Sequence, residues 1–241
     1  EMKEPEKIGI YSNSMNKLDV LHFNSDSLLY VKTLHFPLWN KQRGIPKAYT
    51  RLIQYNDSLF IGTSFMPKEI SVELMNLKTE KVVNSVNFPL KPKEGEYSRP
   101  YECKIATEMN FIVAAYRYIN RLEIYKLSDQ KFQLNTIIGD ANNQYDLYRL
   151  NKDNEMILHY SDIVCGKNQI YALYRGVKEK ELSSANSKIE VYSYDGTHLR
   201  TFDLGRSIEK ILVDESSMRI YAFDRNEEKD IVFCYAIESN T

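Results

Sequence analysis

The chain has 241 residues, a length that suits one large domain or two small ones. Its 32 Lys and Arg residues almost balance its 33 Asp and Glu residues, so the net charge of −1 gives no general attraction to nucleic acid or anionic membranes. Hydrophobic residues make up 43% of the chain, which indicates a globular protein, and the nine glycines form no dinucleotide-binding or phosphate-binding pattern.

Segments that alternate with period two are common, which predicts β-strands. In chain order, the expected strands are 8–11, 18–23 and 29–36; then 51–55, 59–62, 72–77 and 82–88; then 102–106, 111–114, 122–127 and 132–138; then 161–165, 170–173, 189–194 and 199–204; and finally 208–214, 220–223 and 231–236. The chain therefore repeats a unit of four strands, which we call a, b, c and d, joined as a meander.

The clearest repeated element is strand c, which occurs five times, at 18–23, 72–77, 122–127, 189–194 and 231–236. A four-stranded antiparallel unit repeated every ~40–50 residues predicts an all-β fold of the β-propeller type, in which each unit forms one blade. A pair of β-sandwiches is the alternative, but sandwiches would not require the same unit at so regular a spacing.

The two ends of the repeat are incomplete. Residues 1–7 are too polar to be strand a of the first unit, and only 238–241 remain for strand d of the last unit. We therefore expect one propeller domain over 1–241 with a polar tail at 1–7. About five blades are visible, and upstream blade sequence is expected to be missing from this chain.

Three segments of the fourth unit resemble a known family. Tyr160–Val164 (YSDIV), Gln169–Gly176 (QIYALYRG) and Lys188–Gly196 (KIEVYSYDG) are similar to the TolB-like six-bladed β-propeller family of exported proteins and lipoproteins from Bacteroidetes. The resemblance covers residues 30–235 and implies a six-bladed ring, export to the periplasm or cell surface, and no assigned enzymatic activity. Any lipid anchor would lie outside this chain.

The predicted connections differ in length between the two ends of the blades. The a-to-b and c-to-d turns are minimal, whereas 37–50, 89–101, 139–157 and 175–187 are long. Hairpin loops usually have ~2–5 residues, and binding residues tend to lie on longer loops above a rigid scaffold. We therefore predict that a ligand binds on the long-loop face.

Aromatic and arginine side chains are the usual anchors of a binding surface. The candidate ligand-binding residues are Trp39, Arg43, Arg99, Tyr101, Tyr148, Arg149, Asp162 and Arg175. The alternative is that these side chains only pack loops onto blade edges. Asp162 begins a strand a, where it could accept backbone N–H bonds or contact a ligand or cation.

No catalytic or metal-binding residue can be named, and no cofactor is predicted. The four histidines fall at different strand positions, and the charged run at 178–181 is expected to be a solvated loop. Cys103, Cys165 and Cys234 have no metal-ligand spacing and lie among apolar neighbours, so we expect three free, buried thiols.

These observations favour a non-catalytic propeller that binds a peptide, a protein or a glycan, with no nucleic acid partner. The alternative is a cation-dependent propeller hydrolase or lyase acting at the mouth of the central channel. Three or more acidic groups converging on the axis would favour the enzyme.

Overall fold

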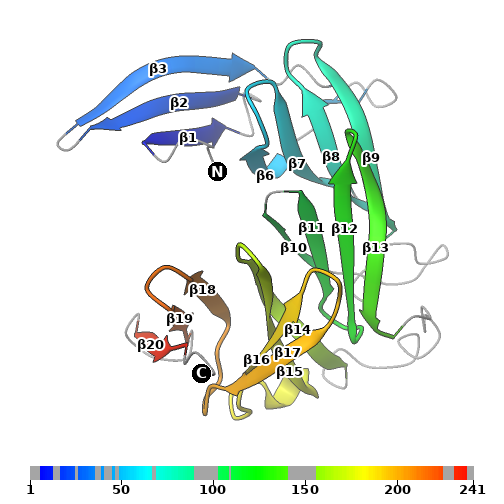
Figure 1. Ribbon diagram of the computed structural model, residues 1–241, viewed down its shortest axis with the longest axis vertical. Coiled ribbons are helices and arrows are strands. Elements are labelled where there is room, and N and C mark those ends of the chain that lie inside the picture. Colours follow the sequence, from blue (N-terminus) through cyan, green and yellow to red (C-terminus); the bar gives the residue numbers. More distant parts are fainter. Residues whose placement is uncertain are drawn as a thin grey trace. The chain divides into compact units, whose positions relative to one another are not determined.

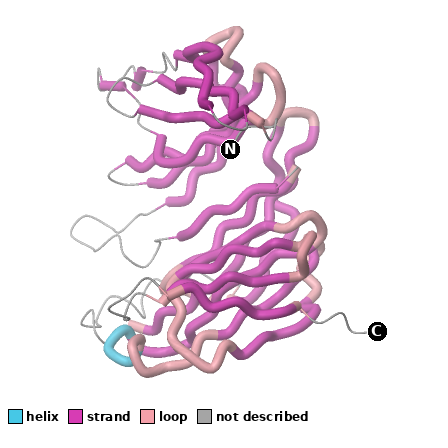
Figure 2. The backbone as a smooth tube through the Cα atoms, turned by 90° about the vertical axis from the view of Figure 1, so that its left-hand side faces the viewer, coloured by secondary structure: helices cyan, strands magenta, loops and turns pink. Residues whose placement is uncertain are grey.

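The computed structural model describes residues 6–12, 17–24, 27–35, 39–40, 45–46, 49–66, 69–89, 103–108, 110–140, 156–224 and 231–237. Strands dominate this part of the chain, and its one helical element is the short 3-10 helix Glu179–Glu181, which is cyan in Figure 2. The described chain forms two compact units, residues 1–89 with 128–132, and residues 90–127 with 133–241.

The first unit contains a three-stranded sheet, a short hairpin and a four-stranded sheet (Figure 1). The strands are β1 (Lys7–Ser12), β2 (Lys17–Asn24) and β3 (Ser27–His35); β4 (Trp39–Asn40) and β5 (Ile45–Pro46); and β6 (Tyr49–Gln54), β7 (Leu59–Met66), β8 (Glu69–Asn76) and β9 (Lys81–Pro89).

The second unit contains two four-stranded sheets and one three-stranded sheet, apart from the turn at 128–132. The strands are β10 (Cys103–Glu108), β11 (Phe111–Tyr116), β12 (Arg121–Ser128) and β13 (Lys131–Gly139); β14 (Ile157–Cys165), β15 (Gln169–Lys178), β16 (Lys188–Ser193) and β17 (His198–Asp203); and β18 (Lys210–Asp214), β19 (Arg219–Phe223) and β20 (Val232–Ala236).

The predicted fold is confirmed. In each of the five larger sheets the strands are hydrogen-bonded in sequence order, as a meander requires. The five predicted c strands are β2, β8, β12, β16 and β20. Among the described residues, the first sheet has no strand a and the last has no strand d. The chain is an all-β propeller built from five small antiparallel sheets.

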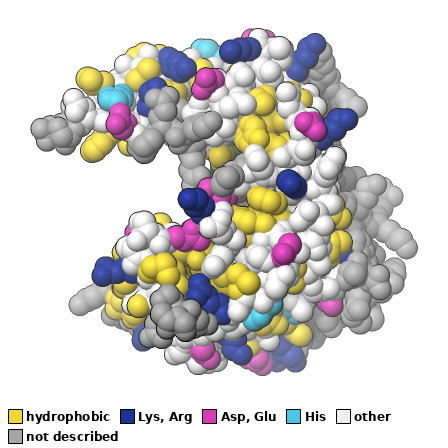
Figure 3. Space-filling model, viewed as in Figure 1, with side chains coloured by type: hydrophobic (Ala, Val, Ile, Leu, Met, Phe, Trp, Pro, Cys, Tyr) yellow, Lys and Arg dark blue, Asp and Glu magenta, His cyan; other side chains and the backbone are white. Residues whose placement is uncertain are grey.

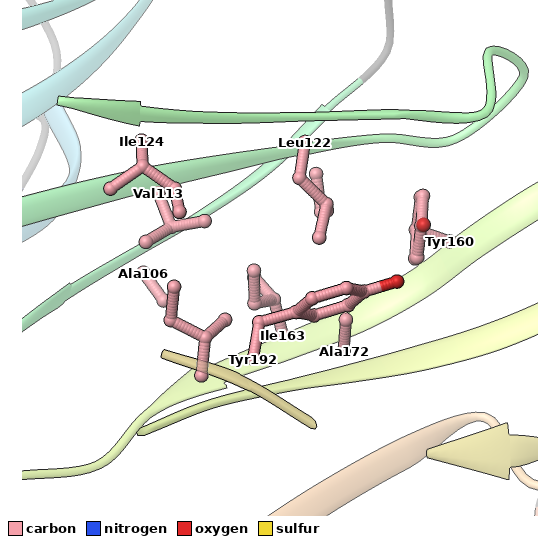
Figure 4. Close-up of a cluster of buried hydrophobic side chains, with 10 residues drawn as sticks. Ala106, Val113, Leu122, Ile124, Tyr160, Ile163, Ala172 and Tyr192 are labelled. Carbon is pink, nitrogen blue, oxygen red and sulfur yellow. The ribbon is translucent and has the colours of Figure 1, made fainter. Parts of the chain in front are cut away.

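Apolar side chains pack the consecutive sheets of the second unit face to face. Between the β10–β13 and β14–β17 sheets, Leu122, Ile124, Ile163 and Ala172 form part of a buried cluster (Figure 4). A second cluster, which includes Leu173, joins the β14–β17 sheet to the β18–β20 sheet. These two clusters bury both faces of the β14–β17 sheet.

In the first unit a smaller cluster lies between the two sheets and includes Leu18, Val20, Tyr49, Phe60 and Met75. The β1–β3 sheet nevertheless leaves many large apolar side chains exposed, and some reach the surface in Figure 3. They are Ile8, Ile10, Phe23, Leu28, Leu29, Tyr30 and Val31.

A glutamate recurs at the same position of strand c and accepts hydrogen bonds from tyrosine. Glu73 accepts from the Tyr49 hydroxyl at 2.8 Å. Glu123 accepts from Tyr125 and from the guanidinium of Arg121. Glu190 accepts from Tyr160 at 3.2 Å and from Tyr192 at 2.8 Å. Each carboxylate is thereby hydrogen-bonded to donors of its own sheet.

The structure corrects three predictions about connections. Strand β15 extends to Lys178, so the predicted loop 175–187 begins only after it. The 178–181 run is not a solvated loop, because it completes β15 and forms the 3-10 helix. The predicted loop 37–50 contains the β4–β5 hairpin and the start of β6.

The thiol prediction was wrong for Cys234. Neither Cys165 nor Cys234 is in a disulfide bond; Cys165 is half-buried, whereas Cys234 is exposed on β20. Alternate residues of β20 face solvent, and Cys234 falls in the exposed set with Val232 and Ala236. The side chain of Cys103 lies outside the described residues.

Candidate functional site

A cavity of about 350 Å3 lies in the second unit, at the end of its sheets where the longer connections emerge. Its walls come from the starts of β10, β14 and β18, from the end of β15, from the 3-10 helix and from the connections that follow β11, β17 and β19. Three consecutive blades therefore contribute to it. A pocket of ~300–1,000 Å3 is the usual size for a small-ligand site.

Three charged residues that line the cavity, Lys104, Asp162 and Lys210, occupy equivalent positions of strand a. The equivalence follows from the sheet register, in which the next residues, Ile105, Ile163 and Ile211, each pair with an alanine of the following strand. Lys104, Asp162 and Lys210 directly precede these isoleucines, and all three line the cavity. The sheet register therefore brings one carboxylate and two ammonium groups to the same level.

Asp162 fastens two of these strands together. Its Oδ2 accepts a hydrogen bond from the Ile211 N–H at 2.9 Å, which joins β14 to β18. Burial raises the pKa of this carboxyl, while backbone donors and the charges of Lys104 and Lys210 oppose that rise. Of the two roles that the sequence left open for Asp162, the structure shows the backbone acceptor.

Arg175 lines the cavity from near the end of β15. Only 7% of the residue is exposed, and its guanidinium donates to the carbonyl oxygens of Ile208 and Leu182 and to the Ser207 hydroxyl. Burial lowers the pKa of Arg175, and the charges of Asp224 and Glu209 oppose that shift. Its Nε atom is buried and has no hydrogen-bond partner within the described part of the chain.

Other lining residues combine charge with apolar surface. Glu179 Oε1 accepts from the Tyr118 hydroxyl at 3.2 Å and lies 4.0 Å from Arg117 Nη2. Leu158 and Leu182 also line the cavity and pack in a small apolar cluster with Tyr118 and Met156. The lining thus offers both hydrogen-bonding groups and an aliphatic surface.

Charges of both signs surround the cavity. Among the described lining residues the basic ones are Lys104, Arg117, Arg175, Lys180 and Lys210, and the acidic ones are Asp162, Glu179, Glu209 and Asp224. The formal excess is one positive charge. Ser161 adds a hydroxyl whose oxygen is buried and has no partner among the described residues.

Two of the eight predicted site residues, Asp162 and Arg175, are brought together in this cavity. The side chain of Trp39 lies outside the described residues, and so do Arg43, Arg99, Tyr101, Tyr148 and Arg149 in full. Sequence analysis missed Lys104, Lys210 and Ser161. Aligning the four a strands of the repeat would have identified the two lysines, because they share the position of Asp162.

The described residues contain no group of three or more His, Cys, Asp or Glu side chains that could hold a metal ion. No helix in that part of the chain has the length and apolar character needed to cross a membrane.

Three solved structures show the same fold. The WD40 domain of coronin from Toxoplasma gondii aligns with a TM-score of 0.55 and 8% identity, covering 99% of this chain and 54% of that one. The propeller domain of Cps50 (Swd1) from Myceliophteria thermophila has a TM-score of 0.51 and 7% identity, covering 92% and 65%. Raptor from Chaetomium thermophilum has a TM-score of 0.51 and 8% identity, covering 97% and 19%.

This chain therefore spans less than two thirds of the length of each of those structures. No curated protein matches it. The model of the TolB-like 6-blade propeller-like family matches residues 1–216, which is most of the chain. The chain belongs to the TolB-like 6-blade propeller-like family.

Proposed function

We propose that this chain is a non-catalytic binding propeller that takes a peptide, protein or glycan ligand into the cavity of its second unit. The observation that carries the proposal is the cavity itself. It lies at the end of three consecutive blades where the longer connections emerge. It is lined by Asp162 and Arg175, two residues selected from sequence alone. We further propose a single propeller domain over 1–241 and export to the periplasm or cell surface, as the family resemblance implies.

The hydrogen bonds of the cavity favour binding over hydrolysis or lyase chemistry. Asp162 accepts from the backbone of β18, and Glu179 accepts from Tyr118. A general acid or base must exchange protons with the substrate, whereas these two carboxylates hold the walls of the cavity together. These hydrogen bonds give the two carboxylates a structural role in the cavity.

A cavity-blocking variant tests the proposal. Ser183 lines the cavity from an exposed turn, and Ser183→Trp should fill it without removing a buried contact. The matched control is Ser85→Trp, which places the same ring on the exposed side of β9 in the other unit. Both variants and the parent should be screened against a peptide library and a glycan array.

We expect ligands of the parent to be lost by Ser183→Trp and kept by Ser85→Trp. Ligands that bind both variants equally would show that this cavity is not the binding site. Turnover of a bound compound by the parent would show instead that the chain is an enzyme.

A further inference from the structure

The chemistry of the cavity narrows the ligand class, and this step rests on the proposed function. The row formed by Lys104, Asp162 and Lys210 alternates positive, negative and positive along three neighbouring a strands. Asp162 Oδ2 accepts the Ile211 N–H, and Asp162 lies between two exposed lysines. The lysine ammonium groups are the mobile charged donors at this level of the cavity.

The buried groups of the cavity that have no partner among the described residues also call for an acceptor. Arg175 Nε–H can only donate a hydrogen bond, and the Ser161 hydroxyl can donate one. Leaving such buried groups unpaired costs free energy. A ligand that presents oxygen acceptors would pair with both groups. A cationic ligand would accept from neither of them and would be repelled by Lys104 and Lys210.

The charge balance selects the kind of acceptor. Because the described lining residues carry one positive charge in excess, a single carboxylate brings the site to neutrality. A doubly charged phosphate would face the carboxylates of Asp162, Glu209 and Asp224 with an excess of negative charge.

The apolar part of the cavity lining indicates which apolar group the ligand carries. The apolar part of the described lining is aliphatic, from Leu158 and Leu182, and it contains no aromatic ring. An aliphatic side chain fits such a wall, whereas a sugar ring commonly packs on an aromatic face.

We propose that the cavity captures the carboxyl terminus of a peptide whose last side chain is aliphatic. Lys104 and Lys210 bind the terminal carboxylate, Ser161 and Arg175 donate to ligand oxygens, and Leu158 with Leu182 contact the last side chain. Recognition of a chain end by converging donors is an established mode of peptide binding.

Calorimetry on the full chain with defined peptides tests this inference. The probes are N-acetylated tetrapeptides ending in leucine, valine or lysine, each with a free carboxylate and with a terminal amide, and glucuronic acid as a sugar carboxylate. We expect the free acids ending in leucine and valine to bind, and their amides to bind at least about tenfold more weakly, because a charge-assisted hydrogen bond is lost. The peptide ending in lysine should bind more weakly than the other two acids.

Lys104→Ala and Lys210→Ala should each weaken binding of the leucine acid by about tenfold and leave the residual affinity of the amide unchanged. The matched control is Lys188→Ala, which removes an exposed lysine of β16 that does not line the cavity. That control should bind as the parent does.

The other outcomes distinguish failure of the carboxylate inference from failure of the proposed function. Equal affinity for acid and amide, with both lost in Ser183→Trp, would overturn the carboxylate inference and leave the cavity as a binding site. Binding of glucuronic acid alone would replace the peptide terminus by a sugar acid. Peptide binding that survives Ser183→Trp, or no binding of any probe, would overturn the inference and would also leave the proposed function without support from these ligands.

Discussion

The β14–β17 sheet and the β1–β3 sheet carry the same repeated strand pattern but differ in burial. In the first, apolar clusters cover both faces, and the outer strand β17 exposes His198, Thr201 and Asp203 beside Leu199. In the second, the outer strand β3 exposes Leu28, Leu29, Tyr30 and Val31. The strand pattern therefore specifies a blade, whereas the neighbouring blades decide which apolar side chains become core.

Hydrogen exchange should reveal the largest difference between the two sheets. Among the described strands β1 pairs with β2 alone, whereas β15 pairs with β14 and β16 and lies between two buried clusters. Local opening needs little free energy where few apolar contacts are lost. Exchange measured by mass spectrometry should therefore be more than about a hundredfold faster in β1 than in β15. Equal protection of the two strands would show that residues outside the described set cover the β1–β3 sheet.

Truncation of a leucine in each sheet should reproduce the comparison in stability. Leu173 of β15 is fully buried, so Leu173→Ala should lower the free energy of unfolding by about 2–5 kcal/mol. Leu29 of β3 is 54% exposed, so Leu29→Ala should change it by less than about 0.5 kcal/mol. Urea titration of both variants measures the two values. A large loss from Leu29→Ala would contradict the exposure of β3.

The acidic residue of strand c should matter more in the β14–β17 sheet. Glu190→Ala removes the acceptor of Tyr160 and Tyr192, and Tyr160 is almost completely buried, so we expect a loss of about 1–3 kcal/mol. Asp19 occupies the corresponding position of β2 and contacts Thr33 and Lys17 near solvent. Asp19→Ala should therefore cost less, as the same titration would show. The reverse order would mean that Asn120 Oδ1, which already lies 3.4 Å from the Tyr160 hydroxyl, replaces Glu190 as its acceptor.

Most of the fold could be predicted because each blade is local in sequence. Strands a to d follow one another with short turns, so alternation within ~50 residues is enough to locate them. Burial of a side chain depends on contacts between neighbouring blades, and the alternation of residues within one blade does not reveal those contacts. Cys234 illustrates this, since its apolar neighbours suggested burial, yet β20 exposes that side of the strand.

The candidate site was only partly predictable for a similar reason. Arg175 was selected for its residue type, but its carbonyl partner Ile208 belongs to the next blade and no local pattern indicates that contact. Glu179 was assigned to a solvated run, yet Tyr118 and Arg117 reach it from the preceding blade. By contrast, the Lys104–Asp162–Lys210 row repeats one position of strand a, so an alignment of the repeats would have shown it, although only Asp162 was selected.

The smallest expected effect is a difference in pH dependence between two aspartates, one in each sheet. In Asp162 burial raises the pKa, so its contribution to stability is present below the pKa of the unfolded chain and is lost as pH rises through the folded pKa. In Asp19 the hydrogen bond from Thr33, and then that from Lys17, lowers the pKa. Its contribution is therefore present above the unfolded pKa and is lost as pH falls through the folded pKa.

Asp162→Asn and Asp19→Asn should accordingly diverge from the parent in opposite directions. As pH rises from strongly acidic to neutral, the free energy of unfolding of Asp162→Asn should increase relative to the parent, and that of Asp19→Asn should decrease. Urea titrations at a series of pH values measure both differences. Parallel curves for the two variants would mean that Asp162 is as well solvated as Asp19, and the cavity wall at β14 would then be open to water rather than closed around its carboxyl.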